Sequence, residues 1–380
     1  MRTSMLSLDD RALAGRDPAL TGLPVVLSDV LLSDLLGEDV HTTRVRYKPG
    51  RSIVAAWSSA DGTRHGWVGS HQDPTKLDKA VMAAERVGSW ALVLDPEGHV
   101  VATDVLGDRA TGQALRAIRR RRPDLLDDAQ HPPTLLRHNP SRRQVWRCRD
   151  LVLRVGAEPV ARRHALAATL EAHDVPVLRP RPVDGSATAE LLPWWGRGDL
   201  AGLPGGGAAA SAGRAVARMH AMPVPRGPRG LGAPAWVCAL VDVAPAWRDR
   251  VLALRRRVDR ALHALPHRPA VRLHGDLSPD QVLVDGGDVR LIDLDRATVG
   301  APEQDLGSFV AAAHLEHRHA LVAPFLEGYA AAGGTYDRSA LATWQAVSLA
   351  QRAIEPFRSR EADWSRRSAE ILADAEQVLP

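Results

Sequence analysis

The chain has 380 residues, 45% hydrophobic and 25% charged, which predicts a folded protein with room for two domains or for a two-lobed enzyme with an added module. No stretch approaches the roughly 20 uninterrupted apolar residues of a membrane helix, and the first ten residues lack the pattern of a signal peptide. Because the net charge is only +4 and the two cysteines, Cys148 and Cys238, lie far apart, we expect a cytoplasmic monomer without disulfides that binds neither nucleic acid nor membranes.

The first half of the chain contains a weak internal repeat. Residues 45–54 resemble residues 136–145, and each segment reads as strand, tight turn and strand. Each is followed by another short strand, a helical stretch and an extended segment. Two copies of one unit favour a duplicated module; the alternative is that two hairpins share turn chemistry by chance. Between them, the basic run Arg119–Arg122 ends an amphipathic pattern and predicts a solvated helix end.

The second half is predicted to be mainly helical. The predicted elements are, in order, a helix ending at His220, a loop over 222–234, a helix over 241–264, a strand over 270–273, a hairpin of strands 282–284 and 289–292, and helices from Asp305 onward. The hairpin prediction rests on the turn sequence Asp285-Gly-Gly-Asp288, which lies between two short apolar runs.

Two short segments in this half carry the residues that phosphoryl transfer needs. They read His274-Gly-Asp276-Leu-Ser-Pro-Asp280-Gln281 and Leu291-Ile-Asp293-Leu-Asp295. Transfer to a hydroxyl needs a carboxylate that accepts the proton, oxygen ligands that hold Mg²⁺ against the phosphates, and cations that neutralise the developing charge. The predicted hairpin folds Asp293 back beside the loop that holds Asp276.

The same segments resemble the motif of the aminoglycoside phosphotransferases, in which His-Gly-Asp is followed by four residues and an asparagine, with Ile-Asp downstream. Residues 300–307, 214–220 and 325–329 also look like that family, so the resemblance covers about residues 190–364. It implies an α+β, two-lobed protein-kinase-like fold. We expect an N-terminal cap module over residues 1–130, a kinase N-lobe over 131–192 and a C-lobe over 193–380.

The resemblance also implies roles for the acidic and amide residues of the motif. Asp276 is similar to the catalytic base, and Gln281 and Asp293 are similar to the magnesium ligands. Asp295 either reaches the metal through water or fixes the loop. His274 resembles a residue that organises the loop, and Asp305 resembles a buried carboxylate that holds it, so both are expected to be structural.

The resemblance implies that the C-terminal stretch over residues 355–364 lines the acceptor pocket. Acidic side chains there suit a cationic amino sugar, although most such residues are ordinary charges on helix surfaces. The candidates are Asp280, Glu316, Glu355 and Asp363.

Two departures from the family pattern affect the nucleotide site. Gln281 stands where asparagine is usual, which resembles the maltokinase and glucosamine-kinase branch, whose members carry an extra N-terminal module. The strand expected to offer a lysine reads Leu151-Val-Leu-Arg154-Val155, so Arg154 is predicted to hold the phosphates. His164 occupies the place of its usual glutamate partner, with Glu158 or Glu171 as substitutes.

Two further segments are expected to contact the nucleotide. The turn Asn139–Arg143 is a weak candidate for a loop over the phosphates, because it lacks the usual glycines. Glu190 and Leu192 resemble the hinge between lobes, where backbone groups hold adenine.

The sequence therefore predicts an ATP- or GTP-dependent and Mg²⁺-dependent kinase that phosphorylates a hydroxyl of an aminoglycoside, amino sugar or sugar. One alternative is a pseudokinase, a binding or regulatory module that kept the fold and lost the reaction. The other is a kinase with a non-sugar acceptor such as choline or a hydroxy-amino acid.

Overall fold

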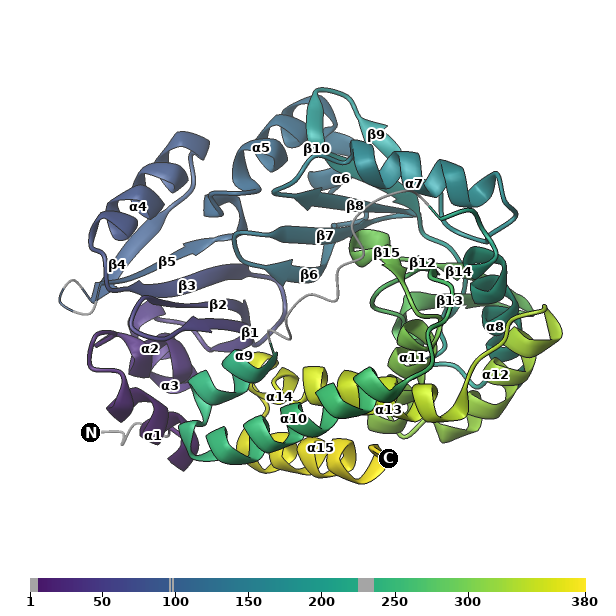
Figure 1. Cartoon of the computed structure of the whole chain (residues 1–380). Helices are drawn as coiled ribbons and strands as arrows, with labels where there is room; N and C mark the ends of the chain where they lie inside the picture. Colours follow the sequence, from purple (N-terminus) through teal and green to yellow (C-terminus); the bar gives the residue numbers. More distant parts are fainter. Residues whose placement is uncertain (1–5, 96, 98, 225–235) are drawn as a thin grey trace.

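The chain folds into two neighbouring antiparallel sheets and a mainly helical part that packs beneath and beside them (Figure 1). The computed structural model describes residues 6–95, 97, 99–224 and 236–380. In that part of the chain, no helix combines the length and the apolar character that a membrane crossing requires.

The first sheet has five strands in the order β1-β2-β3-β5-β4. Its strands are β1 (Val40–Lys48), β2 (Ser52–Ser59), β3 (His65–His71), β4 (Ala91–Asp95) and β5 (Val100–Asp104). Three helices precede it, α1 (Leu8–Arg16), α2 (Leu23–Leu27) and α3 (Asp29–Leu36), and α4 (Thr75–Val87) follows the third strand.

The second sheet repeats this order as β6-β7-β8-β10-β9. Its strands are β6 (Thr134–Asn139), β7 (Arg143–Cys148), β8 (Leu151–Gly156), β9 (Arg181–Val183) and β10 (Ser186–Pro193). The helices α5 (Gly112–Arg121) and α6 (Pro123–Leu126) precede it, and α7 (Ala161–Glu171) follows its third strand. The basic run lies in the last turn of α5 and just beyond, where cations interact favourably with the helix dipole and the predicted helix end is confirmed.

A buried aspartate in front of each sheet fixes the turn of the first hairpin. In the first sheet, Asp17 accepts hydrogen bonds from the Tyr47 hydroxyl at 2.7 Å and from the Gly50 N–H at 2.8 Å. These donors lie 30 and 33 residues after the aspartate. Both donors satisfy a carboxylate that is almost fully removed from solvent, so the helical segment and the turn are joined at one point.

The second sheet has the same arrangement at the same separations. Asp108 accepts from His138 Nε2 at 3.2 Å and from the Ser141 N–H at 2.7 Å, again 30 and 33 residues later. The equal strand order and the equal anchoring support a duplicated module, which stays a prediction. The helices α5 and α6 fall in the range expected for the cap, yet Leu115 and Leu125 on them pack on the second sheet.

Helices dominate the rest of the chain. They are α8 (Gly206–His220), α9 (Trp236–Val243), α10 (Arg248–Ala264), α11 (Glu303–Leu315), α12 (Val322–Ala331), α13 (Arg338–Arg352), α14 (Glu355–Arg358) and α15 (Trp364–Val378). A three-stranded sheet joins β11 (Gly198–Asp199), β13 (Val282–Asp285) and β14 (Asp288–Leu291), and a second small sheet pairs β12 (Val271–Leu273) with β15 (Thr298–Gly300). The predicted strands and hairpin are confirmed.

The single helix predicted over residues 241–264 is wrong. It is divided at Ala244, with α9 ending at Val243 and a 3-10 turn, Pro245–Trp247, leading into α10. Proline lacks a backbone N–H, and it drives the residue before it out of the helical region. Ala244 accordingly has φ −137° and ψ 76°. Most of the predicted loop over 222–234 lies outside the described residues.

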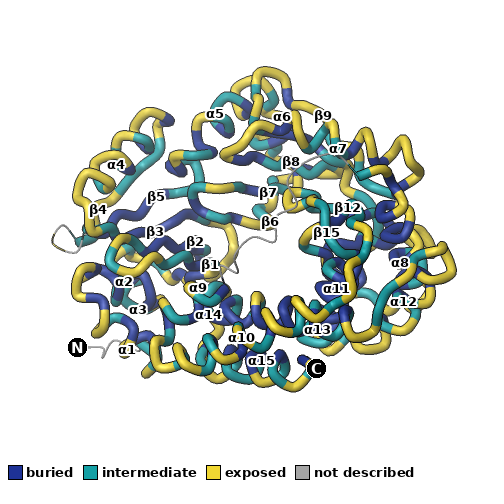
Figure 2. The backbone as a smooth tube through the Cα atoms, in the orientation of Figure 1, coloured by how far each residue is buried: buried dark blue, intermediate teal, exposed yellow. Residues whose placement is uncertain are grey.

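The first sheet and the C-terminal helices share one hydrophobic core. Leu13 and Trp57 belong to the same buried cluster as Leu372 and Trp364 from the end of the chain. Figure 2 shows buried strands in the first sheet and exposed outer surfaces on the helices that cover it. Arg360 and Asp10, both nearly buried, join the two chain ends with an ion pair at 2.9 Å. The N-terminal module is thus fixed against the helical part.

Candidate active site

The loop from His274 to Gln281 is held in place by a buried carboxylate at the start of α11. Asp305, 1% exposed, accepts hydrogen bonds from the backbone N–H groups of His274 at 2.7 Å and Gly275 at 2.9 Å. Its Oδ2 also accepts from His220 Nε2 at 3.1 Å. Burial alone would raise the pKa of Asp305, but the hydrogen bond and charge of His220 and the Gly275 N–H hold it below its ordinary value. Asp305 therefore lies as the sequence predicts, behind the loop.

Gly275 gives this loop a conformation that other residues rarely adopt. Its φ is +84°, and a Cβ at this position would lie 2.1 Å from the Arg296 carbonyl oxygen. Only glycine allows this close approach of the two backbone segments. The turn directs Asp276 outward from the anchored loop, where its side chain is 43% exposed and faces Arg296 Nη1 at 3.3 Å.

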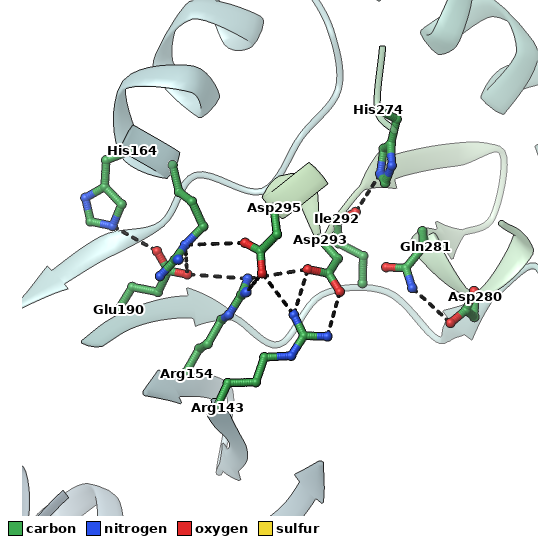
Figure 3. A network of polar contacts seen from close by, with 11 residues as sticks. Arg143, Arg154, His164, Glu190, His274, Asp280, Gln281, Ile292, Asp293 and Asp295 are labelled. Carbon is green, nitrogen blue, oxygen red and sulfur yellow. Dashed lines mark hydrogen bonds and ion pairs between the residues drawn. The ribbon is translucent and has the colours of Figure 1, made fainter. Parts of the chain in front are cut away.

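The β13–β14 hairpin returns the chain beside the same loop. The Ile292 N–H donates to the Gln281 carbonyl at 3.0 Å, and His274 Nε2 donates to the Ile292 carbonyl at 2.8 Å. Asp293 follows with a positive φ of 59°. Gln281 Nε2 donates to Asp280 at 2.9 Å, and its amide oxygen points toward Asp293 (Figure 3). The hairpin thus gathers the residues that the sequence predicted to lie together.

Three arginines from the second sheet and its helix face three carboxylates in a single ionic cluster (Figure 3). We refer to these six residues as the arginine–carboxylate cluster: Arg143, Arg154, Arg163, Glu190, Asp293 and Asp295. The arginines come from β7, β8 and α7, Glu190 comes from β10, and the two aspartates follow β14. The cluster therefore joins the second sheet to the loop that carries the motif residues.

Arg143 binds Asp293 with two parallel hydrogen bonds. Its Nη1 lies 2.9 Å from Oδ1 and its Nη2 lies 3.0 Å from Oδ2, and Nη1 also reaches Asp295 at 3.1 Å. Arg154 contacts Asp295 and lies 3.6 Å from Asp293. Burial alone would raise the pKa of Asp293, but the hydrogen bond and charge of Arg143, with the charge of Arg154, lower it to about 2.

Glu190 provides the acidic partner that the helix after β8 lacks. Its nearly buried carboxylate lies opposite Arg154 on the neighbouring strand and accepts from Arg163 Nε at 3.0 Å and from His164 Nε2 at 3.1 Å. Glu171, one of the expected substitutes, pairs instead with the exposed Arg179 at 3.2 Å.

The sequence does not single out Arg143 or Arg163 as site residues, because an arginine-rich composition gives a single arginine little weight. The local signal that could have found Arg143 is its place as the last residue of the turn expected over the phosphates. In the structure its side chain is only 16% exposed.

Comparison with known proteins places this geometry in a family. The profile of the phosphotransferase enzyme family matches residues 140–346, which is more than half of the chain. The chain belongs to the phosphotransferase enzyme family. This match confirms the family that the motif indicated, and with it the prediction of a small-molecule kinase. The mixed helix and sheet architecture confirms the predicted α+β fold class.

Solved structures support the fold of this phosphotransferase. A choline/ethanolamine kinase family protein from Mesorhizobium loti superposes with a TM-score of 0.51 and 20% identity, over 70% of this chain and 94% of that one. An amicoumacin kinase gives a TM-score of 0.51 and 15% identity, over 70% and 95% of the two chains. No curated protein sequence matches the chain. The likeness to the maltokinase and glucosamine-kinase branch stays a prediction.

The connection between the lobes of the phosphotransferase begins at the end of β10. Leu192 pairs with Val152 in the second sheet, and β11, six residues later, belongs to the sheet of the hairpin. Residues 194–197 therefore cross from one lobe to the other. The exposed Trp194 lies in this crossing, with the Arg147 guanidinium 4.1 Å from its ring. The hinge role of Glu190 and Leu192 stays a prediction, although the Glu190 side chain points into the ionic cluster.

The predicted acceptor residues separate into two groups. Glu316 at the end of α11 lies close enough to Asp280 for their charges to interact: burial and the charge of Asp280 raise the pKa of Glu316 to about 7. Glu355 is paired with Arg44 from β1 and with Arg358, each at 2.8 Å, and Asp363 is paired with a neighbour in its own helix. Asp280 and Glu316 lie at the loop from His274 to Gln281, whereas Glu355 and Asp363 already have cationic partners.

The motif residues of the phosphotransferase offer the ligands that Mg²⁺ prefers. Asp293 and Asp295 supply carboxylate oxygens and Gln281 supplies an amide oxygen, a set of hard donors that suits a cation which keeps several waters. Among residues 6–95, 97, 99–224 and 236–380, no group of three His, Cys, Asp or Glu side chains forms a preassembled metal site. The donor chemistry fits Mg²⁺, but the Asp293 carboxylate is bound by Arg143.

Proposed function

We propose that this chain transfers the terminal phosphoryl group of ATP or GTP to a hydroxyl of an aminoglycoside, an amino sugar or a sugar. The observation that carries the proposal is the position of Asp276. It lies on the loop that Asp305 fixes and that ends at Gln281, and the hydrogen bond from the Ile292 N–H to the Gln281 carbonyl brings Asp293 beside this loop. A rigid carboxylate beside oxygen ligands and guanidinium groups is the set of parts that phosphoryl transfer requires.

Asp276 orients the acceptor hydroxyl and takes its proton as the oxygen attacks phosphorus. Its carboxylate is partly open to solvent, so a hydroxyl can approach it, and the ion pair with Arg296 at 3.3 Å helps to position it. The anchoring through Gly275 and Asp305 means that little reorganisation is needed when the acceptor binds.

Arg143, Arg154 and Arg163 bind phosphate oxygens and neutralise the charge that develops during transfer. Gln281 and Asp293 would hold Mg²⁺, with Asp295 either beside it or holding the loop, and the ion would supply positive charge that stabilises the phosphates. The amicoumacin kinase that shares this fold was solved with AMP-PNP and Ca²⁺, which supports a nucleotide accompanied by a divalent cation.

The test of this proposal is phosphate transfer from radiolabelled ATP or GTP, with Mg²⁺, to a panel of aminoglycosides, amino sugars, neutral sugars and choline. Transfer to one acceptor class, lost in Asp276→Asn, would establish the reaction and its substrate class. Transfer to choline alone would show that the acceptor is choline and not a sugar. The absence of transfer to every acceptor would contradict the proposed reaction.

A second candidate function is nucleotide binding without transfer. The observation that favours it is the paired state of Asp293, both of whose oxygens accept hydrogen bonds from Arg143. The two functions differ in one measurement: a binding module would show a nucleotide-dependent rise in thermal stability but no transfer to any acceptor.

The raised pKa of Glu316 predicts how a cationic acceptor should bind as pH changes. Because burial and Asp280 raise this pKa to about 7, Glu316 is mostly protonated at pH 6 and mostly ionised at pH 8. For an acceptor with a permanent positive charge, we expect KM to fall severalfold between these values. Glu316→Gln should remove most of that fall, as measured by initial rates at fixed ionic strength. A wild-type KM that does not change with pH would contradict a role for Glu316 in acceptor binding.

A further inference from the structure

The contact between Arg143 and Asp293 occupies the carboxylate that the metal needs. Each Asp293 oxygen accepts one guanidinium N–H, at 2.9 Å and 3.0 Å, in the parallel geometry typical of strong arginine–carboxylate pairs. The two side chains are 16% and 22% exposed, so water screens this contact only in part. A divalent cation would have to approach the same oxygens past two positive guanidinium groups, those of Arg143 and Arg154.

The charges of the arginine–carboxylate cluster balance in the free protein. Three arginines contribute +3 and three carboxylates contribute −3, which leaves no net charge. A divalent cation added alone would leave an excess of positive charge, and a triphosphate added alone would leave an excess of negative charge. When both bind, each offsets part of the charge of the other, so the electrostatics favour their joint binding.

Arg143 can leave Asp293 without losing an anionic partner. A guanidinium group binds phosphate with the same paired N–H geometry that it uses for carboxylate. Arg143 is the first residue of β7, directly after the turn that leads from β6, and Arg154 lies on the adjacent strand. Val145 pairs with Arg154, so Arg143, two residues before Val145, lies on the same face of the second sheet as Arg154. Both side chains extend toward the carboxylates that follow β14 (Figure 3).

We propose that Arg143 exchanges between two partners: it holds Asp293 in the free protein, and it binds the phosphates of an incoming nucleotide, which frees the Asp293 carboxylate for the metal. This inference rests on the proposed function for the identity of the nucleotide. It makes the free protein a poor metal binder, and it makes nucleotide and metal each raise the affinity for the other, as thermodynamic linkage requires.

The test is Mn²⁺ binding to the full chain, followed by the electron paramagnetic resonance signal of free Mn²⁺, with and without AMP-PNP. Without nucleotide, we expect Arg143→Gln to bind Mn²⁺ about tenfold more tightly than wild type, the size of one charge-assisted hydrogen bond. AMP-PNP measured without metal should bind the variant about tenfold more weakly, because one phosphate contact is lost. The gain in Mn²⁺ affinity that AMP-PNP confers should be smaller in the variant than in wild type.

Three further variants separate this contact from general effects of charge or folding. Arg162→Gln removes the same charge from an exposed side chain on α7, outside the arginine–carboxylate cluster, and should behave as wild type. Arg143→Lys keeps the charge without the paired geometry and should be intermediate. Adding Asp293→Asn to Arg143→Gln should abolish the gained Mn²⁺ affinity.

The proposed exchange is contradicted if Arg143→Gln binds Mn²⁺ no more tightly than wild type in the absence of nucleotide, or if Arg162→Gln gains as much Mn²⁺ affinity. These measurements need no turnover, so they are independent of the reaction. If the protein shows the expected Mn²⁺ behaviour and binds AMP-PNP, yet phosphorylates no acceptor, the exchange is supported and the proposed function is contradicted. If the protein transfers phosphate but Arg143→Gln and wild type bind Mn²⁺ equally, the proposed function is supported and the exchange is contradicted.

Discussion

Replacing Asp276 with asparagine should lower kcat for phosphate transfer by about 10²-fold to 10⁴-fold, the range for loss of a positioned general base. Asparagine has the same shape but cannot take the acceptor's proton. The change should leave the fold intact, because Asp276 is partly exposed and its ion-pair partner, Arg296, is itself 68% exposed. The measurement is single-turnover transfer to the best acceptor of the panel, compared with AMP-PNP affinity.

The matched control is Asp285→Asn in the nearby hairpin turn. Asp285 is also exposed, and its ion pair with Arg197 at 3.7 Å is open to solvent, so this variant should keep its activity and its stability. Equal activity of Asp276→Asn and wild type would show that Asp276 is not the catalytic base. A parallel loss of AMP-PNP affinity and of thermal stability would instead indicate that the substitution disturbs the loop.

Asp305→Ala should destabilise the protein by about 3–5 kcal/mol, the cost of removing one partner from a buried, hydrogen-bonded ion pair. The substitution would leave His220 Nε2 and the N–H groups of His274 and Gly275 without their acceptor in the interior. It should also reduce transfer, since the loop that carries Asp276 loses its anchor. Urea denaturation followed by circular dichroism measures the first effect, and Asp305→Asn, which keeps one oxygen acceptor, should fall between wild type and the alanine variant.

The destabilisation by Asp305→Ala should depend on pH with a defined sign. Because the folded protein lowers the pKa of Asp305, its carboxylate contributes stability above its unfolded value of about 4, and that contribution disappears as pH falls through the lower folded value. The gap between wild type and the alanine variant should therefore be wide near pH 7 and should narrow in acid. A gap that is constant with pH, or one below about 1 kcal/mol at pH 7, would contradict the role assigned to this carboxylate.

The sequence by itself determined the local elements and the grouping of the motif residues. The turn Asp285-Gly-Gly-Asp288 between two apolar runs defines a hairpin, and a hairpin necessarily returns Asp293 to the loop that precedes it. The repeated hairpins of the first half could be found for the same reason, since turn chemistry and alternating apolar residues are properties of adjacent residues. The apolar pattern over residues 241–264 is continuous, but Pro245 divides this segment into two helices, so the pattern alone predicts one helix too long.

Only the tertiary structure decided which charged side chains meet. The guanidinium of Arg143 and the carboxylate of Asp293 are 150 residues apart in sequence, and Glu190 reaches Arg163 across 27 residues. Apart from the place of Arg143 in the turn expected over the phosphates, nothing local distinguishes these arginines from the many others in an arginine-rich chain. Their selection depends on the register of β7, β8 and β10 and on the packing of the second sheet against the hairpin. Ion pairs between distant segments follow from the arrangement of whole elements, which residue types and spacing alone do not specify.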